Sequence, residues 1–103
     1  MNIQLSGVVT EIKDTYFVMI VNEYPALANI VDNLGEIANN PLRKHRSAHI
    51  WIGRDLAKLI KSTGQSAEEA ITDLGAFRIQ CTIKKCENGN VNITTSGRPV
   101  LLD

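Results

Sequence analysis

The sequence is poor in aromatic residues and cysteine, and it has no long hydrophobic run. Aromatic residues make up only 5% of the 103 residues, and Trp51 is the single tryptophan. No apolar segment reaches the roughly 20 residues of a membrane-spanning helix, and no basic segment followed by an apolar one opens the chain, so we expect neither a membrane span nor a secretory signal. With 44% hydrophobic and 21% charged residues, the composition predicts one globular domain over residues 1–103. Two cysteines without a pairing pattern favour the reducing cytoplasm.

The two cysteines, Cys81 and Cys86, match no disulfide or metal motif. They lie five positions apart in a segment that alternates like one strand, so their side chains should point to opposite faces. A zinc site needs about four ligands, and no neighbouring cysteine or histidine completes such a set. We therefore expect two free thiols, no metal and no cofactor.

Hydrophobic periodicity predicts five strands and three helices. Alternation and β-rich runs indicate strands over residues 2–13, 15–22, 47–52, 76–86 and 91–96. Apolar residues at helical spacing indicate helices over residues 25–38, between Gly53 and Gly64, and over residues 66–74. The last segment, residues 97–103, is partly apolar and should pack against the domain.

Local signals support these boundaries. Gly7 predicts a bulge or bend in the first strand, where the apolar phase slips by one residue. Pro25 suits the first turn of a helix, and Asn39-Asn40-Pro41 is a stop signal at its end. Ser66 and Glu69 have the spacing of a capping box, and Asn-Gly within residues 87–90 predicts a tight hairpin.

The element order is strand, strand, helix, strand, two helices, strand, strand. This order predicts a mainly β protein with helices: a five-stranded OB-like Greek-key barrel with its helix between the third and fourth strands. An α+β sandwich, in which helices cover one face of an antiparallel sheet, is the alternative, and it has the same strands.

Three segments resemble the bacterial single-stranded DNA-binding protein family and its relative, the primosomal replication protein B. They are IQLSGVVTEI at residues 3–12, HIWIGRDLAKLIKSTG at 49–64 and GAFRIQCTIKKCENGNVNITT at 75–95. The resemblance implies an OB barrel, a single-stranded DNA partner, a homo-oligomer and an accessory role in replication or recombination. Three features depart from that family: the helical pattern over 25–38, the extra helix over 66–74, and the lack of an acidic, disordered tail ending in an apolar tip. Without that tail, we do not expect the protein to recruit replication partners as members of the family do.

The basic residues are concentrated in the second part of the chain. Residues 1–40 hold one base against five acids, a net charge of −4, and residues 41–103 hold ten bases against six acids, a net charge of +4. A nucleic-acid site needs cationic side chains along the phosphates and aromatic rings under the bases. The candidates for phosphate contact are Arg43, Lys44, Arg46, Arg78 and Lys84.

Trp51 is the candidate for base stacking, with His49 on the same side of its strand. Two other interpretations stay open. The basic residues of the fourth strand suit an ordinary solvated sheet face, and Trp51 fills the core if Ile50 and Ile52 point outward. Tyr16 and Phe17 fall on opposite faces of the second strand, so one of them should lie in the core. The acidic hairpin before Tyr16 disfavours a phosphate close to this residue.

No catalytic motif is evident, and we expect a binding protein rather than an enzyme. His45 and His49 have a spacing that holds metal only on a helix, whereas here it spans a connector and a strand. The rival hypothesis is a homo-oligomeric assembly module, because the apolar stripe over 25–38 is larger than a short loop helix needs. The dependence of binding on salt concentration distinguishes the two hypotheses, since nucleic-acid binding should weaken steeply with ionic strength and an apolar self-interface should not. The sequence does not separate DNA from RNA.

Overall fold

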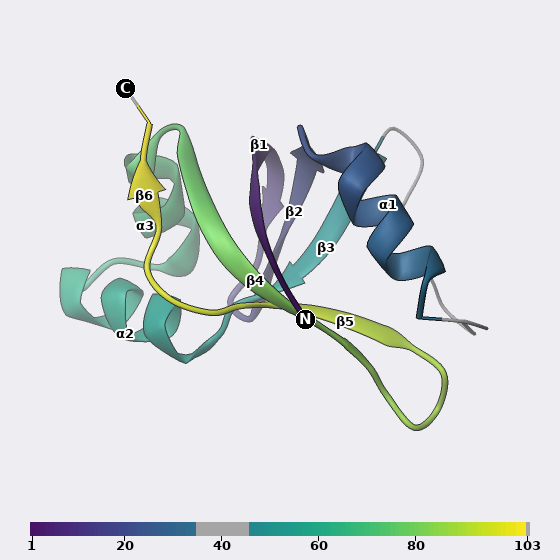
Figure 1. Cartoon of the computed structure of the whole chain (residues 1–103). Helices are drawn as coiled ribbons and strands as arrows, with labels where there is room; N and C mark the ends of the chain where they lie inside the picture. Colours follow the sequence, from purple (N-terminus) through teal and green to yellow (C-terminus); the bar gives the residue numbers. More distant parts are fainter. Residues whose placement is uncertain (35–45, 103) are drawn as a thin grey trace.

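Alternating hydrophobic residues build the wall of a small barrel. The computed structural model describes residues 1–34 and 46–102 (Figure 1). Its strands are β1 (Asn2–Ile12), β2 (Tyr16–Val21), β3 (Ser47–Trp51), β4 (Phe77–Lys85), β5 (Val91–Thr95) and β6 (Val100–Leu101). Strands β1 to β5 are the five that the sequence predicts, and β6 is formed by the apolar tail.

The strand order closes the sheet on itself. The order is β1-β2-β3-β5-β4, and β1 also pairs with β4, so the first and fourth strands complete the circle. All of these neighbours are antiparallel except β3 and β5, which run parallel. This closed mixed barrel confirms the OB-like prediction and rules out the open sandwich. Strand β6 adds to β4 at Phe77 and Arg78, outside the circle.

Gly7 lies where β1 changes partners. Asn2 to Ser6 pair with β4, whereas Gly7 and the residues after it pair with β2. A Cβ at Gly7 would lie 2.0 Å from the carbonyl oxygen of Ile20, and the φ angle of Gly7 is +154°. Gly7 is therefore the residue at which β1 passes from one partner to the other. The slip in phase predicted at Gly7 lies farther on, because the register irregularity of the ladder is between Val9 and Glu11.

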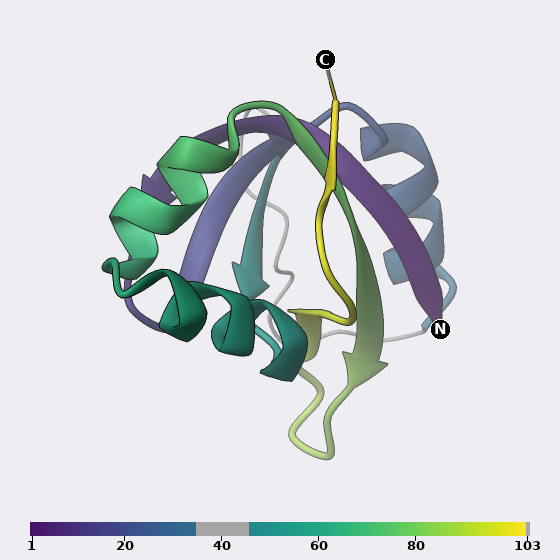
Figure 2. The ribbon, with the colours of Figure 1, turned by 90° about the vertical axis from the view of Figure 1, so that its left-hand side faces the viewer.

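Three helices of the described chain cover the openings of the barrel. They are α1 (Tyr24–Asp32), α2 (Arg54–Thr63) and α3 (Ala67–Leu74). Helices α2 and α3 lie together on one side of the barrel, and α1 lies on the other (Figure 2). The capping box of α3 is confirmed, since Ser66 Oγ accepts a hydrogen bond from the Glu69 N–H at 3.1 Å and the Glu69 carboxylate reaches back to the Ser66 N–H.

The apolar side of helix α1 packs against the core of the same chain. Leu27 and Val31 are fully buried in the core, and Pro25 occupies the first turn as predicted. Glu23, just before the helix, accepts hydrogen bonds from the Ser6 N–H at 2.9 Å and from Ser6 Oγ at 2.7 Å. The helix predicted over 25–38 is confirmed as far as Asp32, whereas residues 35–38 and the stop signal at 39–41 lie outside the described residues.

The core decides which face of β3 is inside. Ala48 and Ile50 are fully buried, whereas 39% of the Trp51 side chain is exposed. The interpretation that places Trp51 in the core is therefore wrong. The buried residues that surround Ile50 in the same cluster come from every element except β6.

Both cysteines are free thiols, as predicted. Cys81 lies in the core, and burial raises the pKa of its thiol to about 12. Cys86 is half-buried and its Sγ accepts a hydrogen bond from the Asn92 side-chain amide at 3.2 Å. Within residues 1–34 and 46–102, no helix has the length and apolar character to cross a membrane.

Candidate nucleic-acid interface

Three aromatic side chains form one cluster on the outer face of β2 and β3. The rings of Tyr16 and His49 are stacked, with centroids 4.0 Å apart and planes inclined by 24°. Trp51 lies 4.9 Å from His49 and 5.7 Å from Tyr16, edge-on to the latter. Such pairs hold each other in place by about 0.5–1.5 kcal/mol each, so the cluster presents a preformed aromatic surface.

Strand register brings these rings together. Tyr16 pairs with Trp51, and Val18 pairs with His49 on the next outward position. The residues between them, Phe17 and Ile50, are fully buried and point inward. Alternation along the two strands therefore sends Tyr16, His49 and Trp51 outward together.

Tyr16 is the site residue that sequence reasoning undervalues. The acidic hairpin before it argues against a role near phosphate. Stacking needs no phosphate, however, because it involves the face of a base. The signal that could have found it is the antiparallel pairing of the second and third strands, which places two aromatic residues directly opposite each other.

Apolar side chains extend the cluster along β2 toward β1. Ile20 lies on the same outer face as Tyr16 and is 36% exposed. Its cross-strand partner is Val8, which is 64% exposed. The outer surface of β1, β2 and β3 is therefore more apolar than the solvated face of an ordinary sheet.

Neutral polar side chains and Lys84 continue the surface in the other direction, across β5 and β4. Trp51 pairs with Thr94, and Thr94 pairs with Thr82. Farther toward the β4–β5 hairpin, Asn92 of β5 pairs with Lys84 of β4. Lys84 is exposed and lies two residues along β4 from Thr82, about 7 Å nearer the hairpin.

Arg46 stands at the opposite end of β3 from Trp51. Its guanidinium lies over the ring of Tyr24 at 5.7 Å from the centroid, a cation–π geometry that ties it to α1. Its φ angle of 65° is in the left-handed region, so the backbone turns sharply into the strand. Five residues of extended strand separate it from Trp51, about 17 Å.

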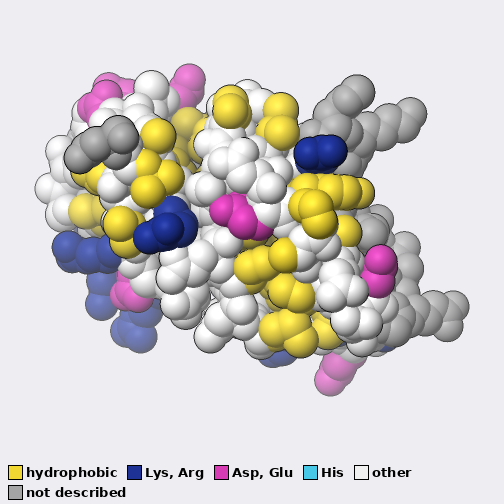
Figure 3. Space-filling model, turned by 45° about the horizontal axis from the view of Figure 1, so that its top comes forward, with side chains coloured by type: hydrophobic (Ala, Val, Ile, Leu, Met, Phe, Trp, Pro, Cys, Tyr) yellow, Lys and Arg dark blue, Asp and Glu magenta, His cyan; other side chains and the backbone are white. Residues whose placement is uncertain are grey.

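Arg78 does not belong to this surface. It pairs with Ser6 of β1 and Val100 of β6, and it lies about 13 Å along β4 from Thr82. On the face drawn in Figure 3, basic side chains gather on the side of α2 and otherwise lie apart, with acidic side chains between them. The single basic surface predicted from Arg46, Arg78 and Lys84 is therefore divided among three places.

The remaining candidates lie outside the described residues, namely Arg43, Lys44 and His45. Among the residues that the structure does describe, no three His, Cys, Asp or Glu side chains are grouped closely enough to hold a metal ion. Lys85, close to Lys84, donates a hydrogen bond from Nζ to the Leu34 carbonyl oxygen at 3.2 Å and so joins the β4–β5 hairpin to the end of α1.

An open hollow of about 620 Å³ adjoins the aromatic cluster. The turn between β1 and β2 forms one wall, Tyr16 belongs to that wall, and the start of α3 forms the other. The charged residues in the lining are Asp14, Glu68 and Lys13. Two carboxylates against one ammonium make this hollow unfavourable for a phosphate.

No protein-family model, curated protein or solved structure matches the chain.

Proposed function

We propose that this protein binds single-stranded nucleic acid, with little sequence preference, on the outer face of β2 and β3. The observation that carries the proposal is the cluster of Tyr16, His49 and Trp51, whose rings lie within 4.0–5.7 Å of one another. Aromatic platforms of this kind stack bases regardless of their identity, because every base has a π face.

The position of the cluster in the barrel supports the same conclusion. In OB barrels, the face of the second and third strands and the loops beside it bind oligonucleotides. Tyr16 opens β2, and Trp51 closes β3. The sequence resemblance to the single-stranded DNA-binding family makes DNA the ligand to try first, with an accessory role in replication or recombination.

Fluorescence of Trp51 tests this proposal directly, because it is the only tryptophan. We expect oligo-dT to quench Trp51 at low salt and high salt to reverse the quenching. Tyr16→Ala should weaken binding roughly 5- to 150-fold, the equivalent of about 1–3 kcal/mol for one stacked base. Tyr16→Phe keeps the ring and should bind nearly as the wild type does.

The anisotropy of a labelled oligo-dT strand detects binding even when the fluorescence of Trp51 does not change. In this assay, Trp51→Ala should bind the strand more weakly than the wild type, by a factor similar to that for Tyr16→Ala. Its circular dichroism spectrum should stay that of the wild type, because the Trp51 side chain is outside the core. If neither Trp51 fluorescence nor anisotropy of the labelled strand detects a complex with the wild-type protein at low salt, the proposal is refuted.

Self-association is the second candidate, and a specific observation favours it. Val100, Leu101 and Leu102 are 52%, 57% and 40% exposed, on or next to the edge strand β6. Exposed apolar edge strands favour pairing with another chain. Sedimentation at low and high salt separates the functions, since an apolar self-interface should persist in salt that dissociates a nucleic-acid complex.

A further inference from the structure

Helix α2 carries a basic stripe that neither the core nor the aromatic cluster uses. Arg54, Lys58 and Lys61 are exposed and lie at positions i, i+4 and i+7 of the helix. At 100° per residue they fall within an arc of about 60°. Leu56, the buried residue of α2, lies on the opposite side, so the stripe faces away from the barrel.

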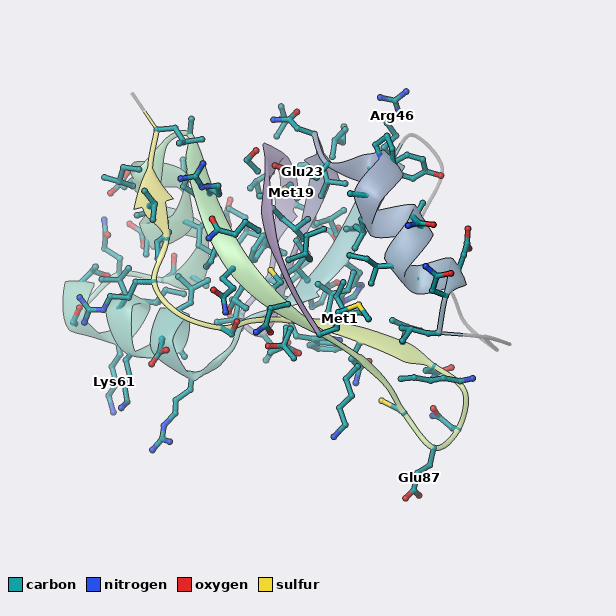
Figure 4. All side chains as sticks on the ribbon, viewed as in Figure 1. Met1, Met19, Glu23, Arg46, Lys61 and Glu87 are labelled. Atoms are coloured by element: carbon teal, nitrogen blue, oxygen red, sulfur yellow. The ribbon has the colours of Figure 1, made fainter. Side chains whose placement is uncertain are left out.

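The stripe begins next to the aromatic cluster. Trp51 is the last residue of β3 and Arg54 is the first of α2, with two residues between them. The junction is held close to β5, because the Gly53 N–H donates a hydrogen bond to Thr95 Oγ1 at 2.7 Å. From Arg54 the stripe runs about 10 Å along the helix, and Lys61 at its far end projects away from the barrel (Figure 4).

A strand stacked on the cluster has few other places for its phosphates. Toward α3 it meets the hollow beside Tyr16, where the carboxylates of Asp14 and Glu68 outnumber the ammonium of Lys13. Toward β1 it meets Val8 and Ile20, which are apolar. These directions offer a polyanion either repulsion or no charge.

Other cations of the described surface are less well placed than the stripe. Arg46 lies against the ring of Tyr24, and Figure 4 shows it on the opposite side of the molecule from Lys61. Arg78 lies beside β6, away from the cluster. Lys84 lies toward the β4–β5 hairpin, where it pairs with Asn92 and not with a residue of β3.

The stripe on α2 combines nearness to the cluster with a concentration of charge. Among the described residues near Trp51, the stripe brings three cations onto one face. Asp55 is the single acid on α2, so the helix keeps a net positive charge. Clustered cations raise the local potential for a polyanion more than the same charges do when they lie apart.

We propose that the stripe of Arg54, Lys58 and Lys61 binds the phosphates of the strand whose bases stack on the aromatic cluster. The ligand then leaves Trp51 over the junction of β3 and α2, and Arg78 makes no phosphate contact. This inference rests on the proposed function and specifies the path of the ligand.

The salt dependence of binding counts phosphate contacts and so tests the path. For single strands, the slope of log K against log salt concentration changes by about 0.7 for each contact. The double variant Lys58→Gln/Lys61→Gln should therefore have a slope shallower by about 1.4 for oligo-dT. Each single variant, Lys58→Gln or Lys61→Gln, should be shallower by about 0.7. Arg78→Gln should keep the wild-type slope, and it is the control matched to the single variants because it also removes one charge, elsewhere on the barrel.

Folding does not confound this comparison. Glutamine and lysine have nearly equal helix propensities, and both lysines are exposed, so the variants should unfold at the wild-type urea midpoint. An unchanged slope for the double variant overturns the inference, and a shallower slope for Arg78→Gln places the phosphates on β4 instead. A wild-type chain that binds no strand at all refutes the proposed function, and the inference falls with it.

Discussion

Replacement of Gly53 by alanine should be one of the most damaging small substitutions in this protein. Gly53 joins β3 to α2 and has an ordinary extended backbone, with φ −82° and ψ 179°. The constraint on this residue is space. A Cβ here would lie 1.9 Å from the Thr95 carbonyl oxygen, where ordinary van der Waals contact is 3.4–4 Å.

The size of the effect follows from that distance. To restore contact, the junction must move away from β5 by roughly 1.5 Å, which breaks the 2.7 Å bond from the Gly53 N–H to Thr95 Oγ1. Overpacking of this kind costs about 1–3 kcal/mol. Thr95 is 3% exposed, so loss of the hydrogen bond to its buried hydroxyl costs a further ~1–3 kcal/mol, the penalty for a buried polar group left without its partner. We expect Gly53→Ala to lower the free energy of unfolding by about 2–6 kcal/mol, out of the roughly 5–15 kcal/mol of a typical domain.

Urea denaturation followed by circular dichroism measures this loss, and Gly64→Ala is the control. Gly64 has φ +72°, but a Cβ added there would have nothing within 4 Å, so alanine meets only a left-handed backbone, at about 1–2 kcal/mol. If Gly64→Ala is the more destabilising of the two, the steric reasoning about Gly53 is wrong. Thr95→Val should cost less in the Gly53→Ala background than in the wild type, because the bond it removes is already broken.

Three further predictions concern the helix cap and the thiols. Ser66→Ala should lower the free energy of unfolding by about 1 kcal/mol in urea denaturation, because the capping box of α3 loses its acceptor; an unchanged midpoint would contradict this. Cys86 should react with iodoacetamide in the native state at pH 7 and Cys81 only after unfolding, as mass spectrometry of the labelled peptides can show, because burial raises the pKa of the Cys81 thiol to about 12. Because the pKa of the Cys81 thiol is raised from its ordinary value of 9.0, its contribution to the free energy of unfolding is fully present below pH 9 and declines as the pH rises toward 12. In urea denaturation measured across this range, Cys81→Val should show a smaller decline in stability than the wild type.

The order of strands and helices could be predicted from the sequence because it depends on local patterns. Alternation in β4 places Phe77, Ile79, Cys81 and Ile83 on one face, and all four are buried. Local chemistry likewise identified the capping box at Ser66, whereas the irregularity predicted at Gly7 lies between Val9 and Glu11. These signals depend on residues close together in the chain, and a β-β-α-β-α-α-β-β order leaves few compact arrangements.

The sequence could not determine which face of β3 points inward. Alternation divides Ser47–Trp51 into two sets, but each set contains large apolar residues, so periodicity alone is neutral between them. Closure of the barrel decides the question, because the space inside is filled by Ile50 and its neighbours in the core. Trp51 is thereby left on the outside beside Tyr16, a contact that depends on the pairing of two strands far apart in the chain.

The distribution of charge was also a matter of tertiary structure. Arg78 and Lys84 share one face of β4 in the sequence pattern, but the strand is long enough to carry them to opposite ends of the barrel wall. Arg54, Lys58 and Lys61 are predicted from the pattern only to lie on the surface of a helix. Their relation to Trp51 depends on how Gly53 packs against Thr95. Local sequence therefore sets the elements and their two faces, whereas the assembly of rings and charges into one surface needs the closed barrel, because it joins residues that are distant in the chain.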